Sequence, residues 1–343
     1  MVITRAGRRR TLLFAVAIVA LLSPLVLAPT AASAGNGHGN HHHAPVVRVL
    51  ASGLQGTSGG TIGPDGALYV TESAIGQVTR IDTRTGARSV YASGLPLPLI
   101  PLGGAIDVAF IGRTAYVLVT VVGPDVGGTS VDGIYRVDDA DSFTVIADLG
   151  EYSRTHPPTT AFDLDRGLQF ALQPYRGGFL VTDGHHNRVL QVSKSGAISQ
   201  VIQFGNIVPT GLDVSGKRVY LAEAGPVPHN PADGKVVTFG VKRPVVREVA
   251  SGYSLLVDVE FGPRGSLYAL SQGDSPGDVP AGSPALGDSG ELLRVTNHGK
   301  LAVVVDGLDL PTSVDFVRDT AYVVTVGGEI LKVSNVSGSH GHH

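Results

Sequence analysis

Carboxylates recur at matching positions along six similar apolar segments. Each segment holds one reference residue: Tyr69, Tyr116, Leu180, Tyr220, Tyr268 or Tyr322. The third residue after each reference is, in chain order, Glu72, Val119, Asp183, Glu223, Ser271 and Thr325. Three acids at equivalent strand ends offer the oxygen ligands that Ca²⁺ and other hard cations prefer. Glu72, Asp183 and Glu223 are therefore the candidate metal ligands, and solvation of a wet channel is the alternative role.

A second group of acids lies in the short segments that precede the first group. Asp107 and Asp258 stand near the starts of these segments, and Asp213, Glu260 and Asp315 lie one pleat deeper. Alternation along a strand keeps such positions on a common side. Gathered around an axis, they could hold Ca²⁺ in a central channel. They could equally solvate that channel or hydrogen-bond neighbouring segments, and the sequence leaves both interpretations open.

The densest polar turn is Asp183-Gly184-His185-His186-Asn187. It can be a tight turn, because Asp and Asn tolerate positive φ. It can also be a site that combines a carboxylate with imidazoles. His156 and His229 lie in long loops and could face the same region. The predicted ligand-binding set is Glu72, Asp107, Asp183, His185, Glu223 and Asp258, and no residue is assigned as catalytic.

The sequence lacks the characteristic motifs of several enzyme classes. There is no G-x-S-x-G elbow, no H-E-x-x-H motif and no P-loop, and without cysteine there is no thiol nucleophile. Nor does the sequence show a dense cluster of Arg, His and Lys of the kind that would hold the carboxylates of pyrroloquinoline quinone. Enzymatic activity is therefore undecided, and a cofactor other than a divalent cation is not expected.

The segments that carry these acids read as strands of a repeated hairpin unit. The unit TSGGTIGPDGALYVTESAIGQVTRID (57–82) has a Gly-Pro-Asp-Gly turn between β-rich runs, and related phrases recur five more times. Five further runs follow these units as outer strands, and the run Val46–Leu54 supplies the sixth from the front. Four strands per repeat of about 40–55 residues predict a propeller. We expect an all-β, six-bladed β-propeller with four-stranded antiparallel blades, its last blade closed by the N-terminal strand.

Loop lengths predict which face of this propeller is functional. The turns between first and second strands and between third and fourth strands are short. Long insertions occupy the other connections: Pro96–Gly104, Val121–Asp132, Gly150–Arg166, Glu223–Gly234 and Ser271–Gly290. These connections emerge on one face, and long loops on a rigid scaffold are where binding usually occurs. We expect a small molecule or an extracellular protein to bind there.

The ends of the chain indicate export. Four arginines precede an apolar run (11–28) and Ala32-Ser33-Ala34, the pattern of a secretory signal peptide over residues 1–34. A Gly/His-rich linker (35–45) and a His-rich tail (339–343) flank the propeller (46–338). These histidines could bind divalent metal or serve only as flexible tails. Without the signal, 22 basic and 29 acidic residues remain. We expect a secreted, extracellular bacterial monomer with no disulfides, no membrane anchor and no nucleic-acid partner.

The phrases ASGLQGTSGGTIGPDGALYVTES (51–73) and DGLDLPTSVDFVRDTAYVVTVGGEILKV (306–333) resemble secreted bacterial β-propellers of the ScyD/ScyE type. The resemblance spans about 46–336 and implies a six-bladed propeller related to NHL-type and gluconolactonase-type propellers. It brings no catalytic residues to this chain. A binding or scaffold module is the leading hypothesis. A metal-dependent lactonase or related hydrolase is the competing class, in which Glu72, Asn187 and Asp258 would imitate the metal ligands.

Overall fold

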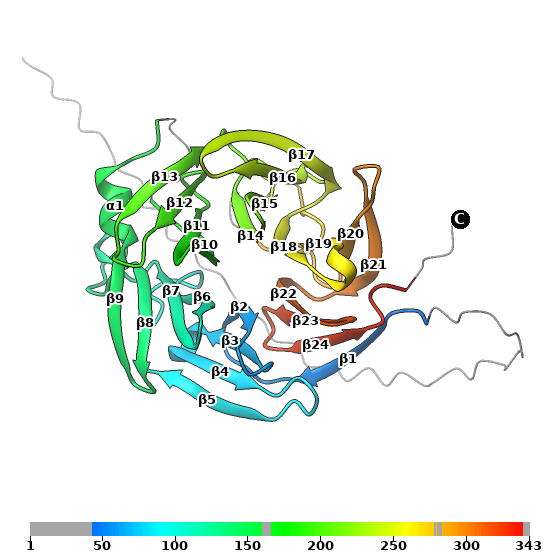
Figure 1. The fold of residues 1–343 in the computed structure, drawn as a ribbon, viewed down its shortest axis with the longest axis horizontal. Helices are drawn as coiled ribbons and strands as arrows, with labels where there is room; N and C mark the ends of the chain where they lie inside the picture. The colour runs from blue at the N-terminus through cyan, green and yellow to red at the C-terminus, as the bar shows by residue number, and fades with distance from the viewer. Residues whose placement is uncertain (1–42, 160–165, 278, 280–282, 339–343) are drawn as a thin grey trace, which may run out of the picture. The chain divides into compact units, whose positions relative to one another are not determined.

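A computed structural model describes residues 43–159, 166–277, 279 and 283–338 of the chain. Within the compact unit His42–His343, six four-stranded antiparallel sheets form a ring (Figure 1). The predicted six-bladed β-propeller is confirmed. Residues 1–42 and 339–343, which hold the predicted signal peptide, most of the linker and the tail, lie outside the described residues.

The blades are numbered from the first complete sheet in the chain. Blade 1 comprises β2 (Thr57–Ile62), β3 (Leu68–Glu72), β4 (Gln77–Ile81) and β5 (Arg88–Ser93). Blade 2 comprises β6 (Gly104–Ile111), β7 (Thr114–Thr120), β8 (Gly133–Asp139) and β9 (Ser142–Asp148). Blade 3 comprises β10 (Gln169–Tyr175), β11 (Gly178–Asp183), β12 (Arg188–Val192) and β13 (Ile198–Gln203).

Blade 4 comprises β14 (Pro209–Ser215), β15 (Arg218–Glu223), β16 (Gly234–Gly240) and β17 (Arg243–Tyr253). Blade 5 comprises β18 (Leu256–Phe261), β19 (Leu267–Ser271), β20 (Gly290–Val295) and β21 (Leu301–Leu308). Blade 6 comprises β22 (Pro311–Val317), β23 (Thr320–Thr325), β24 (Ile330–Ser334) and β1 (Val46–Ala51). The first strand of each of blades 1 to 5, and β22 of blade 6, is the inner strand. Each inner strand contacts the inner strands of both neighbouring blades, which closes the ring.

The N-terminal strand completes blade 6, as the sequence predicts. β1 runs antiparallel to β24, with Val46 opposite Ser334 and Val49 opposite Leu331 (Figure 1). The front of the chain therefore covers the edge of β24 that would otherwise expose unpaired backbone groups. Early and late parts of the sequence meet in one sheet at this seam.

The core lies between blades rather than within them. One apolar cluster fills each of the six junctions between adjacent blades in the described part of the chain. The second strands are buried on both faces for this reason; every residue of β3 is buried. At four junctions the reference tyrosine meets a phenylalanine of the next blade, as in Tyr69–Phe110, with ring centroids 4.8 Å apart. Such aromatic pairs stabilise the contact beyond their buried area.

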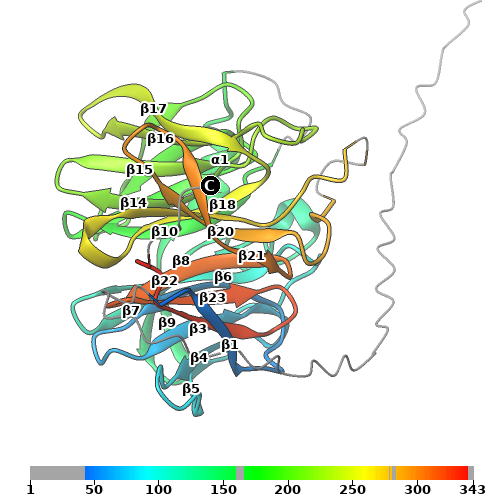
Figure 2. The same cartoon turned by 90° about the vertical axis from the view of Figure 1, so that its right-hand side faces the viewer.

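Long connections lie between second and third strands and between the fourth strand of one blade and the first strand of the next, as predicted. They join β5 to β6, β7 to β8, β9 to β10, β15 to β16 and β19 to β20, and the last of these projects from the ring in Figure 2. Short 3₁₀ turns lie in three connections: η1 (Ser73–Ile75), η2 (Pro124–Val126) and η3 (Pro263–Gly265). No helix in the described ranges is both long and apolar enough to cross a membrane.

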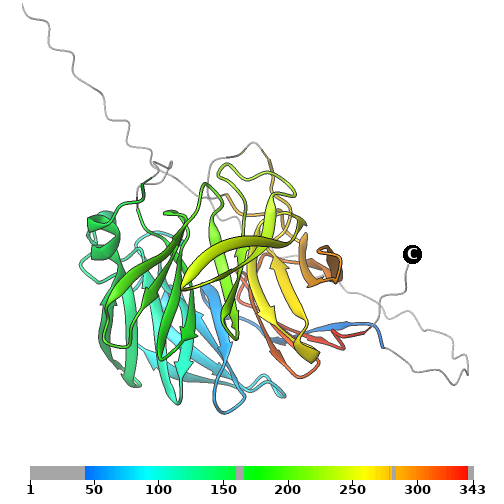
Figure 3. The same cartoon turned by 45° about the horizontal axis from the view of Figure 1, so that its top comes forward.

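The connection from β9 to β10 holds a helix that loop length alone does not predict. α1 (Leu149–Thr155) stands at the periphery of the ring beside blades 2 and 3 (Figure 3). Asp148 caps it by accepting a hydrogen bond from the Glu151 backbone N–H at 2.7 Å. An acid at the N-cap and a glutamate three residues later form a helix-start signal. This local signal explains why part of the segment 150–166 is helical rather than irregular.

Candidate functional site

Glu72 ends β3 with its carboxylate fully engaged inside blade 1. Its Oε2 accepts the Gln55 backbone N–H at 2.8 Å, and its Oε1 accepts from Gln77 Nε2 at 3.2 Å and from the Thr79 hydroxyl. The residue is buried. These bonds tie the segment entering blade 1 to the end of β3. Glu72 therefore acts as a structural acceptor in this structure.

Asp183 ends β11 and forms the centre of a buried polar network. Its Oδ2 accepts from Arg188 Nε at 2.8 Å and lies 3.2 Å from His186 Nδ1, and its Oδ1 accepts the Leu168 backbone N–H at 3.2 Å. Burial by itself would raise the pKa of this carboxyl. The hydrogen bonds and charges of His186 and Arg188 outweigh burial and lower the pKa below its usual value. Asp183 is therefore an ionised anchor.

Arg188, the first residue of β12, is the cation that this anchor requires. Its side chain is 1% exposed, and it donates to Asp183, to the His156 carbonyl at 2.6 Å and to Ser153 Oγ at 3.2 Å. The guanidinium also lies 5.3 Å from the centre of the Tyr152 ring. Because Ser153, Tyr152 and His156 belong to α1 or its end, Arg188 fastens the helix to blade 3.

Glu223, at the equivalent end of β15, has a different environment. It lies opposite Lys235 in the β15–β16 pairing, but Lys235 Nζ bonds to Glu248 Oε2 at 3.2 Å. Burial raises the pKa of Glu223 to about 7, with Lys235 lowering it and Glu248 raising it. Glu72, Asp183 and Glu223 thus lie at equivalent strand ends, as predicted, but in three separate blades and in different environments.

Asp107 and Asp258 face the channel and join the inner strands of adjacent blades. Each lies at a β-bulge, and its Oδ1 accepts the next backbone N–H of its own strand at 2.8 Å. The other oxygen accepts from the following blade: Leu172 N–H to Asp107 at 2.7 Å and Val314 N–H to Asp258 at 2.8 Å. A Cβ on Gly59 or Gly211 would collide with these carboxylates. The interpretation as inter-blade hydrogen bonding holds for both residues.

Of the deeper acids, Asp213 follows the same pattern, and all of them share one electrostatic consequence. Asp213 accepts the Phe261 N–H of the next blade at 3.0 Å. Burial raises the pKa of Asp258 to about 7 and of Asp315 to about 8, with added repulsion from neighbouring acids. Burial and the same repulsion raise the pKa of Glu260, and burial raises those of Asp107 and Asp213. In the described ranges, no three His, Asp or Glu side chains converge as a metal site requires.

The loop histidines separate into different roles. His185 lies 6.3 Å from the Phe170 ring, its Nδ1 has no partner, and burial lowers its pKa to about 4. Burial also lowers the pKa of His229. His156 stacks on Tyr152 with ring centroids 4.3 Å apart. These three residues do not line the pocket described next.

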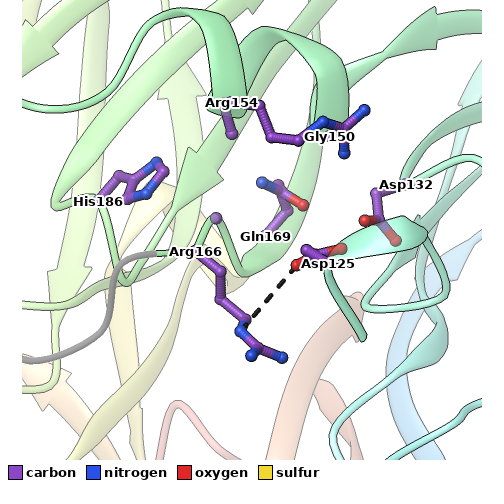
Figure 4. A pocket seen from close by; sticks show the side chains of 9 residues that line it. Asp125, Asp132, Gly150, Arg154, Arg166, Gln169 and His186 are labelled. Carbon is purple, nitrogen blue, oxygen red and sulfur yellow. Dashed lines mark ion pairs between the residues drawn. The ribbon is translucent and has the colours of Figure 1, made fainter. Parts of the chain in front are cut away.

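A pocket of about 260 Å³ opens between blades 2 and 3 (Figure 4), and none of the six predicted ligand-binding residues lines it. We call it the blade 2–3 pocket. Blade 2 contributes acids from the β7–β8 connection, α1 contributes one wall, and blade 3 contributes the rest. Its lining residues are Asp125, Asp132, Gly150, Ser153, Arg154, Arg166, Gly167, Gln169 and His186.

His186 is the most informative residue of this pocket. It is 1% exposed, its Nδ1 lies between Asp183 Oδ2 (3.2 Å) and Arg188 Nη2 (3.1 Å), and its Nε2 has no hydrogen-bond partner. Figure 4 shows the imidazole at the pocket wall. Its turn is held by Asn187, at φ 51°, whose Oδ1 accepts the N–H groups of Ile207 and Val208 at 2.8 Å. The sequence 183–187 is thus both a turn and part of a site.

The predicted ligand-binding set includes His185, whereas His186, the next residue of the same turn, lines the pocket. Asp125, Asp132, Arg154 and Arg166 were missed because charged residues in long loops usually face solvent. Arg188 was not predicted as a site residue for a related reason, because the sequence does not show whether a cationic side chain at the start of a strand is buried.

Comparisons with known proteins agree with the fold. No family model matches the chain, and no curated protein matches it. Among solved structures, it is similar to a gluconolactonase from Xanthomonas campestris (12% identity, 84% of this chain and 89% of that one, TM-score 0.59). It is also similar to aldose sugar dehydrogenase from Streptomyces coelicolor (13%, 84% and 98%, 0.58) and to virginiamycin B lyase from Staphylococcus aureus (12%, 84% and 99%, 0.52). At these identities the likeness shows the propeller fold alone.

Proposed function

We propose that this chain is a secreted propeller of the ScyD/ScyE type that binds a small polar molecule in the blade 2–3 pocket. The observation that carries the proposal is the unpartnered Nε2 of the buried His186 at the pocket wall. A buried polar group without a partner costs about 1–3 kcal/mol. A ligand that bonds to Nε2 would recover that free energy.

The pocket is also built to hold its shape. Asp183 and Arg188 fix the His186 ring from behind, and Gln169 is held by Thr120 Oγ1 at 2.8 Å. Side chains locked by second partners bind a ligand without first losing rotamer freedom. Such preorganisation on a rigid scaffold supports binding at this face.

A metal-dependent lactonase is the second candidate, and it would place its cation among the channel acids. Asp258 and Asp315 have raised pKa values, and a bound cation would relieve their repulsion. Two of the similar solved structures are named as gluconolactonases. In that case the reaction centre would be in the channel, and the blade 2–3 pocket would be unnecessary.

The test separates the two sites. Thermal unfolding is followed with a panel of small polyols, amino acids, carboxylates and lactones, each with and without Ca²⁺, alongside an assay of lactone hydrolysis. We expect some panel members to raise the melting temperature of wild type and of a His185→Phe control but not of His186→Phe. Lactone hydrolysis that requires metal and is lost in Asp258→Asn would instead establish the second candidate.

Two further properties follow from the proposal. The protein should be recovered from culture medium with residues 1–34 removed, and it should elute as a monomer on size exclusion. Retention in the cytoplasm, or a stable dimer, would contradict these expectations. Either result would leave the pocket itself intact.

A further inference from the structure

The blade 2–3 pocket is divided by the charge of its walls. The β7–β8 connection contributes two acids, Asp125 and Asp132, which lie close together in Figure 4. Blade 3 contributes His186 and, from the segment before β10, Arg166. The charges of the walls balance overall, but the negative and basic groups come from different blades.

The charged groups on these walls keep bonding capacity for a ligand. Arg166 Nε lies 4.0 Å from Asp125 Oδ2, a longer contact than a charge-assisted hydrogen bond (Figure 4). Asp132 Oδ1 accepts the Val122 N–H at 2.7 Å, but no cation of the described residues forms an ion pair with this carboxyl. Burial and the nearby charge of Asp125 raise its pKa. A ligand cation placed between the two acids would be stabilised by both.

His186 presents a donor on the opposite side. His186 Nδ1 lies 3.2 Å from Asp183 Oδ2, and an ionised carboxylate can only accept, so a proton on Nδ1 donates to Asp183. A ring that also holds a proton on Nε2 is a cation, paired with Asp183 through Nδ1–H. Its second N–H, on the Nε2 that has no partner among the described residues, would then be available to a ligand. Together with Arg166, this N–H would bind an anionic oxygen.

We propose that the ligand of the blade 2–3 pocket is a small zwitterion, with an ammonium group between Asp125 and Asp132 and a carboxylate on Arg166 and His186. This inference rests on the proposed function and specifies its ligand class. A zwitterion matches both walls at once. A simple amine or carboxylate would satisfy one wall and leave the other unpaired.

Isothermal titration calorimetry of the secreted chain tests the ligand class. The probes are the small L-amino acids from alanine to glutamine, with propylamine, propionate and glucose as matched comparisons. At least one amino acid should bind, and propylamine and propionate should each bind about tenfold or more weakly, because each loses a charge-assisted bond. Asp125→Asn and Arg166→Gln should each weaken amino-acid binding by about tenfold.

The control is the exposed ion pair Arg136–Asp138 on β8, whose removal by Arg136→Gln should leave binding unchanged. Glucose binding that is lost in His186→Phe, without amino-acid binding, would overturn the zwitterion and leave the proposed function standing. Amino-acid binding that is unaffected by Asp125→Asn and Arg166→Gln would also overturn it. The absence of binding by every probe and every compound of the wider panel would overturn both.

Discussion

The end of β11 and the central channel both bury carboxylates, but with opposite electrostatic results. Asp183 meets His186 Nδ1 at 3.2 Å and the buried guanidinium of Arg188 at 2.8 Å, and these partners lower its pKa against the effect of burial. Among the described residues, Asp258 accepts from two backbone N–H groups and is repelled by Asp213, and burial raises its pKa to about 7. Burial alone therefore does not decide how a propeller acid behaves. The presence of a cation in the same low-dielectric space decides it.

Removing the cation should have the largest effect. Arg188→Met leaves the buried Asp183 without its guanidinium partner, so we expect the free energy of unfolding to fall by about 3–5 kcal/mol. The measurement is urea unfolding at pH 7. Arg80→Met is the control, because Arg80 pairs with Asp65 at 2.7 Å on the surface and should cost at most about 1 kcal/mol. Equal losses in the two variants would contradict the distinction between the regions.

Removing a channel acid should cost less, because only neutral donors lose a partner. Asp258→Ala leaves the N–H groups of Val259 and Val314 without their acceptor. We expect a loss of about 2 kcal/mol by urea unfolding at pH 5, where the carboxyl is largely protonated. Asp258→Asn keeps one acceptor oxygen and should lose less. An Asn variant as unstable as the Ala variant would show that these hydrogen bonds do not carry the effect.

The channel should also make stability depend on pH in a stated direction. The folded-state pKa values of Asp258 (about 7) and Asp315 (about 8) lie above those of unfolded aspartate. Their contribution is full below the unfolded pKa and is lost as pH rises through 7 to 8. We expect unfolding free energy to fall by about 1–3 kcal/mol between pH 5 and pH 9. Asp258→Asn should flatten this slope, and a slope unchanged by that variant would refute the assignment.

The smallest effect is expected at Glu223, which occupies the strand position of Asp183 without its cation. Burial raises the pKa of Glu223 to about 7, so ionisation at pH 8 disfavours the folded state. Glu223→Gln should therefore raise stability by about 1 kcal/mol at pH 8 and have little effect at pH 5. Asp183→Asn, the matched variant, should be destabilising at both pH values. Destabilisation by Glu223→Gln at pH 8 would show an unrecognised partner.

The architecture was predictable because its signals are local. The Gly-Pro-Asp-Gly turn and the alternating run that ends at Glu72 define one hairpin, and six similar units define six blades. The position of β1 followed from counting outer strands, and the structure pairs it with β24. α1 was missed although its Asp148 and Glu151 form a local start signal, because loop length was given more weight.

The candidate site was only partly predictable. The turn 183–187 was identified by its composition, but the sequence could not distinguish His185 from His186. That choice depends on which ring meets Asp183 and Arg188 and which meets Phe170. The aspartates of the blade 2–3 pocket come from the β7–β8 connection and its arginines from the β9–β10 connection. Their meeting required the folded positions of α1 and blade 3.

The sequence by itself determined the strands, their pairing order and the face that bears long loops, because alternation and turn chemistry are properties of neighbouring residues. Only the tertiary structure decided the role of each acid. Asp107 receives its hydrogen bond from Leu172 and Asp258 from Val314, and the Arg188 that neutralises Asp183 also holds the distant His156 carbonyl. The partners of Asp107 and Asp258 come from neighbouring blades, and the burial that lets Arg188 control the Asp183 carboxyl depends on how α1 packs against blade 3, so the sequence near each acid does not specify its role.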